Sequence, residues 1–375
     1  MKILHVVENL DKGAVENWLV NVFEQSRKYR PNWEWTFFCI LNKPGCLDER
    51  VKGLGGKIIY APFWISNRFL FLKSLRSLLL REKFDIIHAH HDFLSGFYLI
   101  STIGIKELTV INHVHNADEI VPVGNSRLQK LLLYPLASLA GIISDKTIGI
   151  SNYTLKKFRS KQLVHSKFSR VLYYGINLKK FSKNIGYDLR SELGIDPSIK
   201  ILLFIGRFNR EKNPSFLIDI AVQLRKSRND FVMVFVGQGE QENLIKEKAE
   251  LFDCKNIIYI LGWRDDVSQI MLDSDIFVFP RLQEPKEGLG LVVVEAQSAG
   301  LPTICTNGIL DDAIIIPELV DRIALDRVED WVLRIDSILS NPLIIKQNQA
   351  IEEMEKSPFE INNATFNLLE LYEGE

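Results

Sequence analysis

Short, nearly continuous apolar runs alternate with amphipathic stretches along the first half of the chain. Apolar runs between polar or glycine-containing turns are typical of strands buried on both faces, and apolar residues three and four apart are typical of helices with one buried face. The first half is predicted to contain strands at Lys2–Val7, Trp35–Leu41, Lys57–Tyr60, Asp85–Ala89, Thr109–Val114 and Thr147–Ile150, and helices at Ala14–Ser26 and Phe69–Leu80.

The same alternation restarts near Lys200, after the polar stretch Asn177–Ser198. The second half is predicted to contain strands at Lys200–Ile205, Phe231–Val236, Asn256–Leu261, Asp275–Pro280 and Thr303–Thr306, and helices at Pro214–Lys226, Glu242–Phe252 and Asp266–Asp273. Such alternation indicates parallel sheets covered on both faces. A chain of 375 residues is long for one domain. We therefore predict an α/β protein of two doubly wound, Rossmann-like domains that face one another across a cleft.

The segment Pro280–Pro302 carries two glutamates, Glu287 and Glu295, separated by seven residues. It lies between two predicted strands. Parallel neighbours are usually joined by a helical crossover, so Leu291–Ala299 is predicted to be a helix despite its valines. The free N–H groups at the start of such a helix bind anions such as phosphate. Two carboxylates beside that helix start would suit the hydroxyl groups of a sugar.

Arg207 follows the predicted strand Lys200–Ile205, and Lys212 precedes the next predicted helix. Ligands of doubly wound sheets bind outside the carboxyl ends of the strands. A guanidinium group and an ammonium group at that place can hold a diphosphate, the first through paired hydrogen bonds and the second as a point charge. A basic loop alone is more often only solvated, but the glutamate segment in the same domain favours a functional role.

Five of the seven histidines fall in two groups, each at the end of a predicted strand. We expect them to provide polar groups for sugar hydroxyls or a phosphate. A metal site at His88–Asp92 is disfavoured, because successive strand residues face opposite sides and no second ligand set has zinc spacing. The two groups are His88, His90 and His91, and His113 and His115.

The composition, with 46% hydrophobic and 25% charged residues, is that of a globular protein. No apolar run reaches the roughly 18 residues of a membrane-spanning helix, and the first residues do not resemble a signal peptide. Four scattered cysteines are typical of a reducing compartment, so we expect a cytoplasmic protein. Gly237–Glu242 lacks the third glycine of a dinucleotide fingerprint and there is no P-loop, which disfavours hydride transfer and ATP hydrolysis.

The net charge of −1 conceals an asymmetry between the two halves. Residues 1–180 carry 26 lysines and arginines against 14 acidic residues, a net of +12, and the remainder carries 20 against 33, a net of −13. This favours an anionic or membrane-surface partner for the first half, and no nucleic acid is expected. In Asn67–Lys83, basic residues alternate with a wide apolar stripe. The segment is interpreted either as a core-facing helix with a solvated basic side or as an interfacial surface against anionic lipid.

Taken together, these residues resemble the family 4 retaining glycosyltransferases, which have the GT-B architecture of two Rossmann-like domains. The resemblance covers nearly the whole chain and is strongest at Glu287–Pro302, which is similar to the family's glutamate–seven–glutamate motif. Bacterial enzymes that assemble capsule, exopolysaccharide or lipopolysaccharide are the most similar subgroup. The other matching segments are Gly206–Phe208, Lys212–Asn213, Lys12–Glu16, His113–Asn116, Ser151, Gly237–Gly239 and Leu261–Gly262.

The resemblance implies retaining transfer of a hexosyl unit from a nucleotide-diphosphate sugar to the hydroxyl of a glycan or polyprenyl-linked glycan. A UDP-sugar is expected before a GDP-sugar. Residues 1–178 would bind the acceptor, residues 179–355 would bind the donor, and residues 356–375 would form a helix that crosses back to the first domain. No cofactor and no metal are expected, because two cations and a helix end already serve the diphosphate. The protein would be cytoplasmic, at the inner face of the membrane if the basic half binds lipid.

The resemblance also implies roles for single residues. Arg207 and Lys212 would hold the donor diphosphate. Glu287 would contact the donor sugar, and Glu295 would accept hydrogen bonds from the ribose hydroxyls. His115 completes the expected catalytic group with Arg207, Lys212 and Glu287. The other expected donor contacts are Gly13, Gly262, Trp263, Arg264, Gly290 and Leu291. The expected acceptor-side residues are Gly13, Ala14, His88, His113 and Asn116.

The chain departs from the family pattern at three places. Ala14 replaces a glycine, Tyr174 stands where asparagine is frequent, and the link Arg281–Lys286 is longer than usual. Glu284 therefore competes with Glu287 for the donor-facing position. Three alternatives remain open: a sugar-nucleotide epimerase, a phosphorylase, and a non-catalytic nucleotide- or glycan-binding subunit.

Overall fold

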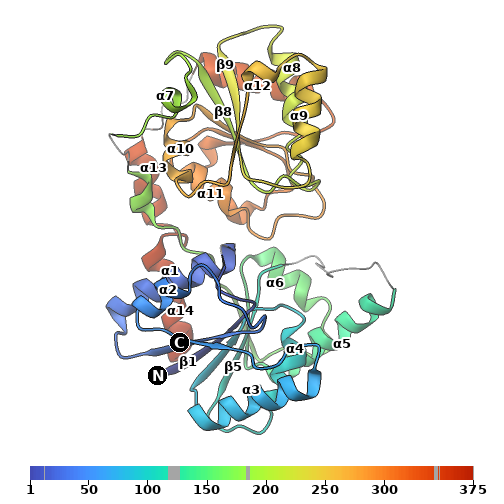
Figure 1. The fold of residues 1–375 in the computed structure, drawn as a ribbon, viewed down its shortest axis with the longest axis vertical. Helices are drawn as coiled ribbons and strands as arrows, with labels where there is room; N and C mark the ends of the chain where they lie inside the picture. The colour runs from blue at the N-terminus through green and yellow to red at the C-terminus, as the bar shows by residue number, and fades with distance from the viewer. Residues whose placement is uncertain (12, 117–126, 183–185, 342–344, 346, 375) are drawn as a thin grey trace. The chain divides into compact units, whose positions relative to one another are not determined.

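The computed structural model describes residues 1–375 apart from 12, 117–126, 183–185, 342–344, 346 and 375. Contacts within the chain divide it into two compact units (Figure 1). The first unit comprises Met1–Ile176 together with Pro358–Glu375, and the second comprises Asn177–Ser357. The sequence placed these boundaries after residues 178 and 355.

The first unit is a parallel sheet with helices on both sides. Its strands are β1 (Lys2–Val7), β2 (Glu34–Cys39), β3 (Lys57–Tyr60), β4 (Ile86–Ala89), β5 (Thr109–Val114), β6 (Lys146–Gly149) and β7 (Phe168–Val171). Its helices are α1 (Ala14–Tyr29), α2 (Asp48–Gly53), α3 (Arg68–Glu82), α4 (Ser95–Tyr98), α5 (Arg127–Ile143), α6 (Asn152–Arg159) and α14 (Ile361–Glu373). The strand order is β3-β2-β1-β4-β5-β6-β7.

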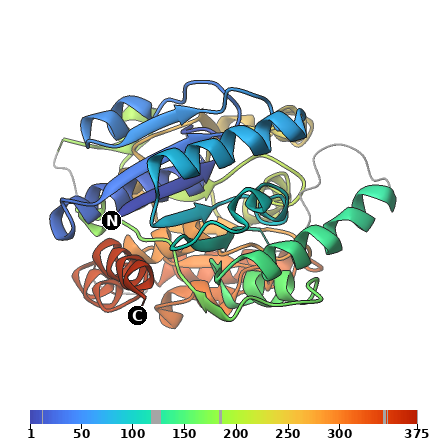
Figure 2. The ribbon, with the colours of Figure 1, turned by 90° about the horizontal axis from the view of Figure 1, so that it is seen from below.

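The two faces of this sheet differ in chemistry. On one face, Leu4 of β1 and Ile87 of β4 pack in an apolar core with Phe71 of α3. Because alternate strand residues face opposite sides, His5 and His88 face the other way, toward α14. Figures 1 and 2 show α3 and α14 on opposite sides of the sheet. The first sheet therefore has an aliphatic face and a face rich in histidine.

The second unit has the same layered design. Its strands are β8 (Lys200–Ile205), β9 (Phe231–Val236), β10 (Ile258–Gly262), β11 (Ile276–Phe279), β12 (Thr303–Cys305) and β13 (Val320–Arg322). Its helices are α7 (Leu189–Leu193), α8 (Phe216–Leu224), α9 (Glu242–Leu251), α10 (Val267–Asp273), α11 (Leu291–Ser298), α12 (Val328–Ser340) and α13 (Gln347–Glu355). The strand order is β10-β9-β8-β11-β12-β13, and all pairings between these described strands are parallel.

The predicted architecture of two parallel-sheet α/β domains is confirmed. The hydrophobic pattern missed β7, β13 and several helices, among them α5, which continues through Pro135. None of the described helices combines the length and the hydrophobicity that a bilayer-spanning segment requires.

Candidate active site

β8 and β11 lie side by side at the centre of the second sheet, and the chain leaves them in opposite directions. β8 leads outward to β9, whereas β11 leads outward to β12. Such a topological switch point opens a crevice at the carboxyl ends of the strands, where ligands of doubly wound sheets bind. Arg207 and Arg281 each lie two residues beyond the end of one of these strands. The fold thus brings two arginines to the switch point.

One carboxylate at the switch point bonds two cations. Glu287 accepts hydrogen bonds from Lys212 Nζ and Arg281 Nε through the same oxygen, Oε2. Arg281 is buried and also donates to the carbonyl oxygens of Leu282 and Pro285, so it fixes the loop after β11. Burial alone would raise the pKa of Glu287, but the charges of Lys212 and Arg281 outweigh burial and lower that pKa. Glu287 is therefore an ionised carboxylate that accepts hydrogen bonds from two cations.

Lys212 is held on several sides. Its backbone N–H donates to Asn209 Oδ1 at 3.0 Å, and its ammonium group lies 5.3 Å from the centroid of the Phe279 ring. Burial lowers the pKa of Lys212, although the charge of Glu287 opposes this. The sequence predicted Lys212 as a cation for a diphosphate, and in the structure its charge is shared with Glu287.

Arg207 differs from both neighbouring cations. Its side chain is exposed and makes no hydrogen bond or ion pair with any residue that the structure describes. With Arg207, Lys212 and Arg281 against Glu287, these four groups carry a net formal charge of +2. The net charge of these four groups therefore favours binding of an anion. Arg207 is the member whose side chain has no hydrogen bond or ion pair with a described residue.

The predicted helix after the glutamate loop is confirmed as α11. Gly290 precedes it with a φ of 85°, a conformation that favours glycine. Glu295 lies on the helix, and its carboxyl group has no partner among the described residues. Burial raises the pKa of Glu295 to about 7, with the charge of Lys180 opposing. Near neutral pH this carboxyl group can therefore both donate and accept hydrogen bonds, as sugar hydroxyls require.

The loop after β10 contains the residues expected near the base. Trp263 is exposed, and its indole N–H donates to Asp265 at 3.3 Å. Arg264 is bonded to both Asp266 and Glu192, which raise its pKa. The Arg264 guanidinium is thus already paired with carboxylates of the protein, whereas the Trp263 ring is exposed to solvent.

Gly13 and Ala14 lie in the connection after β1, which forms the switch point of the first sheet together with β4. Gly13 caps α1, and a Cβ atom there would lie 1.9 Å from a carboxylate oxygen of Glu16. Ala14 is exposed at the start of α1. Lys12, which belongs to the matching loop, lies outside the described residues. The place of Gly13 fits the predicted tight turn, and its role stays a prediction.

The expected histidines of the first unit are buried. His88 and His113, expected on the acceptor side, are fully buried, and His115, expected in the catalytic group, is nearly so. His115 bonds Tyr174 through Nδ1. Asn116 is exposed, and its amide donates to Asp92 at 3.1 Å. Of these four, only Asn116 has an exposed side chain, so the acceptor-side roles of the histidines stay predictions.

Sequence reasoning did not find two residues that shape these sites. Arg281 was assigned to a long link, although it follows β11 at the same distance as Arg207 follows β8. Tyr174 was noted only as a departure from the family pattern, and in the structure it closes a chain of histidines. Glu284 is exposed, and no described residue pairs with it, whereas Glu287 holds the position between the two cations.

Two family models match consecutive parts of the chain. Residues 29–180 match Glycosyltransferase Family 4, and residues 188–357 match Glycosyl transferases group 1. CapH of Staphylococcus aureus, a capsular polysaccharide biosynthesis glycosyltransferase, is 22% identical over 99% of this chain and 98% of its own. An Escherichia coli galactosyltransferase acting on GlcNAc-diphosphoundecaprenol with UDP-Gal is 31% identical over 63% of this chain and 61% of its own.

Solved structures share the fold over the full length. HepE of Anabaena, in complex with UDP-glucose, has a TM-score of 0.77 at 16% identity and covers 100% of both chains. WaaG, a glycosyltransferase involved in lipopolysaccharide biosynthesis, has a TM-score of 0.74 at 15% identity, again over 100% of both chains. With a family 4 domain followed by a group 1 domain on two parallel sheets, the chain belongs to the glycosyltransferases of the GT-B architecture.

Proposed function

We propose that the protein is a retaining hexosyltransferase that uses a UDP-sugar and acts on the hydroxyl of a glycan or polyprenyl-linked glycan. The observation that carries the proposal is the unpaired Arg207 beside the bonded trio of Lys212, Glu287 and Arg281 at the switch point of the second sheet. Positive charge at the switch point, together with the Glu295 carboxyl group of the same domain, suits a ligand with a diphosphate and several hydroxyls.

The charges lie where glycosyl transfer needs them. As the bond between the anomeric carbon and the diphosphate oxygen breaks, the carbon becomes cationic and the diphosphate gains negative charge. Arg207 and the start of α11 would stabilise that negative charge. Lys212 is already fixed by Glu287 and Asn209, so it needs little reorganisation during the reaction.

The state of Glu287 favours retention without a covalent intermediate. Two cations share its oxygen Oε2 and lower its pKa, which makes it a weak nucleophile. We therefore infer attack by the acceptor hydroxyl on the face that the diphosphate leaves. The hydroxyl proton passes to the departing phosphate oxygen as the new glycosidic bond forms.

The related proteins support the substrate classes. UDP-glucose occupies HepE, and the Escherichia coli relative takes galactose from UDP-Gal to a diphosphoundecaprenol-linked sugar. These proteins motivate a UDP-sugar donor and a lipid-linked acceptor for this chain.

We also infer that the first unit contacts an anionic membrane surface. Leu75 and Leu79 of α3 are buried, which agrees with a core-facing helix. At its start, however, Trp64 and Phe69 are exposed, and Arg68 lies between them in the sequence. Aromatic side chains beside basic residues suit an anionic membrane surface.

A screen of nucleotide sugars tests the donor. We expect one UDP-sugar to raise the melting temperature, and NMR analysis of the product to show the anomeric configuration of the donor. An inverted product would contradict retention. Conversion of the donor without acceptor would indicate an epimerase, a requirement for free phosphate would indicate a phosphorylase, and binding without transfer or hydrolysis would indicate a binding subunit.

A further inference from the structure

Five histidines gather on one face of the first sheet, between 0% and 7% exposed. Alternate residues of a strand share a face, so residues 88 and 90 face the same way, as do 113 and 115. Neighbouring strands supply the remaining members of the cluster. The sequence argument against a metal considered His88–Asp92 alone, whereas the structure brings together histidines from three strands. The cluster consists of His5, His88, His90, His113 and His115.

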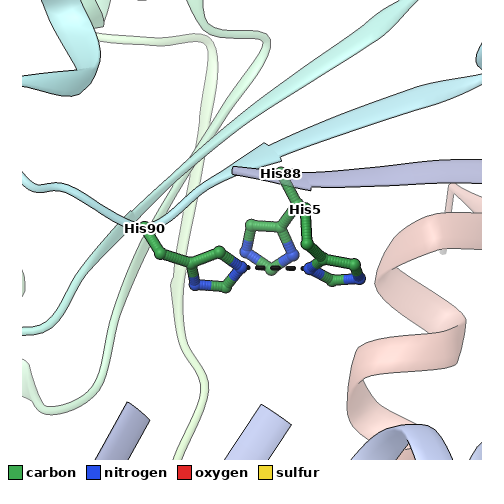
Figure 3. A group of neighbouring side chains, drawn as sticks. All are labelled: His5, His88 and His90. Atoms are coloured by element: carbon green, nitrogen blue, oxygen red, sulfur yellow. Dashed lines mark hydrogen bonds between the residues drawn. The ribbon is translucent and has the colours of Figure 1, made fainter. Parts of the chain in front are cut away.

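The rings are joined in two hydrogen-bonded chains. Figure 3 shows the bond between His5 and His90, with His88 beside them. The first chain runs from His5 Nδ1 to His90 Nε2 at 3.0 Å, from His90 Nδ1 to His115 Nε2 at 3.0 Å, and from His115 Nδ1 to the Tyr174 hydroxyl. The second chain runs from His113 Nδ1 to His88 Nε2 at 3.2 Å and from His88 Nδ1 to the Tyr372 hydroxyl at 2.6 Å.

Each chain is closed by a tyrosine at one end and left open at the other. The open ends are His5 Nε2 and His113 Nε2, which are buried without a hydrogen-bond partner among the described residues. A buried polar atom without a partner is costly and rare, and an ion is one of its explanations.

We propose that His90, His113 and His115 bind one divalent transition-metal ion of the zinc class. One ring nitrogen from each lies within 4.8 Å of the other two. The bonded nitrogens of His90 and His115 are 3.0 Å apart, and two nitrogens on a tetrahedral zinc with bonds of about 2.0–2.1 Å lie about 3.3 Å apart. These two nitrogens therefore need to separate by a few tenths of an ångström, and the nitrogen of His113 has to approach from a distance of up to 4.8 Å.

A second trio, His5, His88 and His90, satisfies the same distance condition but is the weaker candidate. Each trio has one member with an unpaired ring nitrogen, His5 in the second trio and His113 in the proposed one. The proposed trio is preferred because its members come from the carboxyl ends of two adjacent strands, β4 and β5, where ligands of doubly wound sheets bind.

The surroundings of the trio match those of ligating histidines. With one arrangement of ring protons, the second nitrogen of each ligand donates to a fixed neighbour, which orients the ring and raises its basicity. These donations run from His90 Nε2 to His5 Nδ1, from His115 Nδ1 to the Tyr174 hydroxyl, and from His113 Nδ1 to His88 Nε2.

The charge state of the trio also suits a metal. Burial lowers the pKa of His90 and His113 well below the usual value and that of His115 to about 3, so all three are neutral at pH 7. A metal ion needs the lone pair of a neutral imidazole. Asp92 accepts a hydrogen bond from the backbone of His115 at 2.6 Å, and with Glu16 it acts electrostatically on Tyr174. Their negative charge would offset the dication.

Titration of chelator-treated protein with zinc chloride and cobalt chloride tests the site. We expect one equivalent of metal per chain, a higher melting temperature and a cobalt spectrum typical of nitrogen ligands. His90→Gln and His113→Gln should weaken binding at least tenfold, while His165→Gln, which changes an exposed histidine outside the cluster, should leave it unchanged.

Two results would overturn the site. One is folded protein that takes up no zinc, and the other is equal uptake by the folded His90→Gln variant. If the variants do not fold, X-ray absorption at the zinc edge of the unchanged protein still reports whether histidine nitrogens surround the ion. UDP binding measured on the same samples reports separately on the proposed function.

Discussion

Lys212 and Glu287 form an ion pair in which only 18% and 20% of the respective side chains are exposed. The two residues come from loops after different strands, β8 and β11, so the pair fixes these loops against one another. Arg281 joins the pair from below the surface, which leaves a positive excess. The pair thus fixes the carboxylate that we propose faces the donor, and the two cations balance its charge.

Arg207 should contribute mainly to the transition state. Arg207→Ala should lower kcat by about a hundredfold to a thousandfold, since one fixed donor to a developing negative charge contributes that much. Its melting temperature should stay unchanged, because no described residue depends on the side chain. Arg210→Ala removes another exposed arginine of the same loop and should behave as the unchanged protein. Equal losses in both variants, measured by initial rates, would contradict the assignment.

Glu287 should affect both stability and activity. Glu287→Ala leaves Lys212 and Arg281 without their shared carboxylate, and should lower the free energy of unfolding by about 1–3 kcal/mol. Transfer should fall strongly as well. Glu284→Ala, at an exposed position of the same loop, should change neither quantity. Urea denaturation and rate measurements on both variants decide which glutamate faces the donor.

Glu295 should make stability depend on pH in the neutral range. Its pKa is about 7 in the folded protein, above the ordinary value of 4.5, so the folded state holds the proton more tightly. Its contribution is complete below pH 4.5 and is lost as pH rises through 7, by on the order of 1–3 kcal/mol. Glu295→Gln should therefore flatten the melting temperature between pH 5 and 8, and Glu250→Gln, at an exposed site, should not.

His5 should make the first unit sensitive to acid. Burial lowers its pKa from 6.5 to about 3, so below pH 6.5 only the unfolded chain takes up the proton. Stability is complete above pH 6.5 and is lost toward pH 3, by about 1.4 kcal/mol for each pH unit.

His5→Phe keeps the stacking on Trp35, whose ring centroid is 4.6 Å away, and removes the titrating group. Denaturation at pH 7.5, 6 and 5 should show a shallower decline for this variant. An unchanged slope would mean that His5 is not buried neutral. His165→Phe provides the exposed control.

Trp64 and Phe69 should carry membrane binding. Phe69 is 75% exposed, and the double variant Trp64→Ser/Phe69→Ser should release the protein from vesicles containing anionic lipid. The control variant Leu251→Ser changes a leucine of the second unit that is 77% exposed. This variant should float with the vesicles to the same extent as the unchanged protein. Flotation that is absent at low salt, or that does not weaken at high salt, would contradict an anionic surface as partner.

Strands were the part of the fold that the sequence predicted best. Thr109–Val114 and Phe231–Val236 agree with β5 and β9 residue for residue. For Phe231–Val236, a continuous apolar run between polar residues leaves little choice of where the strand begins and ends. α11 was predicted against the preference of its valines, because the parallel strands around it require a crossover. α5 was missed because its helix continues through Pro135.

The candidate site was predictable only in part. Arg207 and Glu287 follow from motif spacing, whereas the pairing of Lys212 with Glu287 depends on how two loops meet. Arg281 lies in a stretch without periodicity, so its burial left no signal in the pattern. The histidine cluster forms because three strands pair side by side. It could not be predicted from a hydrophobic pattern that describes each strand separately.

The first unit is completed by residues that are synthesised after the second unit. α14 packs on α1, and Tyr372 bonds His88, so the histidine face of the first sheet is closed by Pro358–Glu375. During synthesis the second unit, which is continuous from Asn177 to Ser357, can mature before the first. Until Pro358–Glu375 has been synthesised, the first sheet keeps an uncovered face that a chaperone could protect.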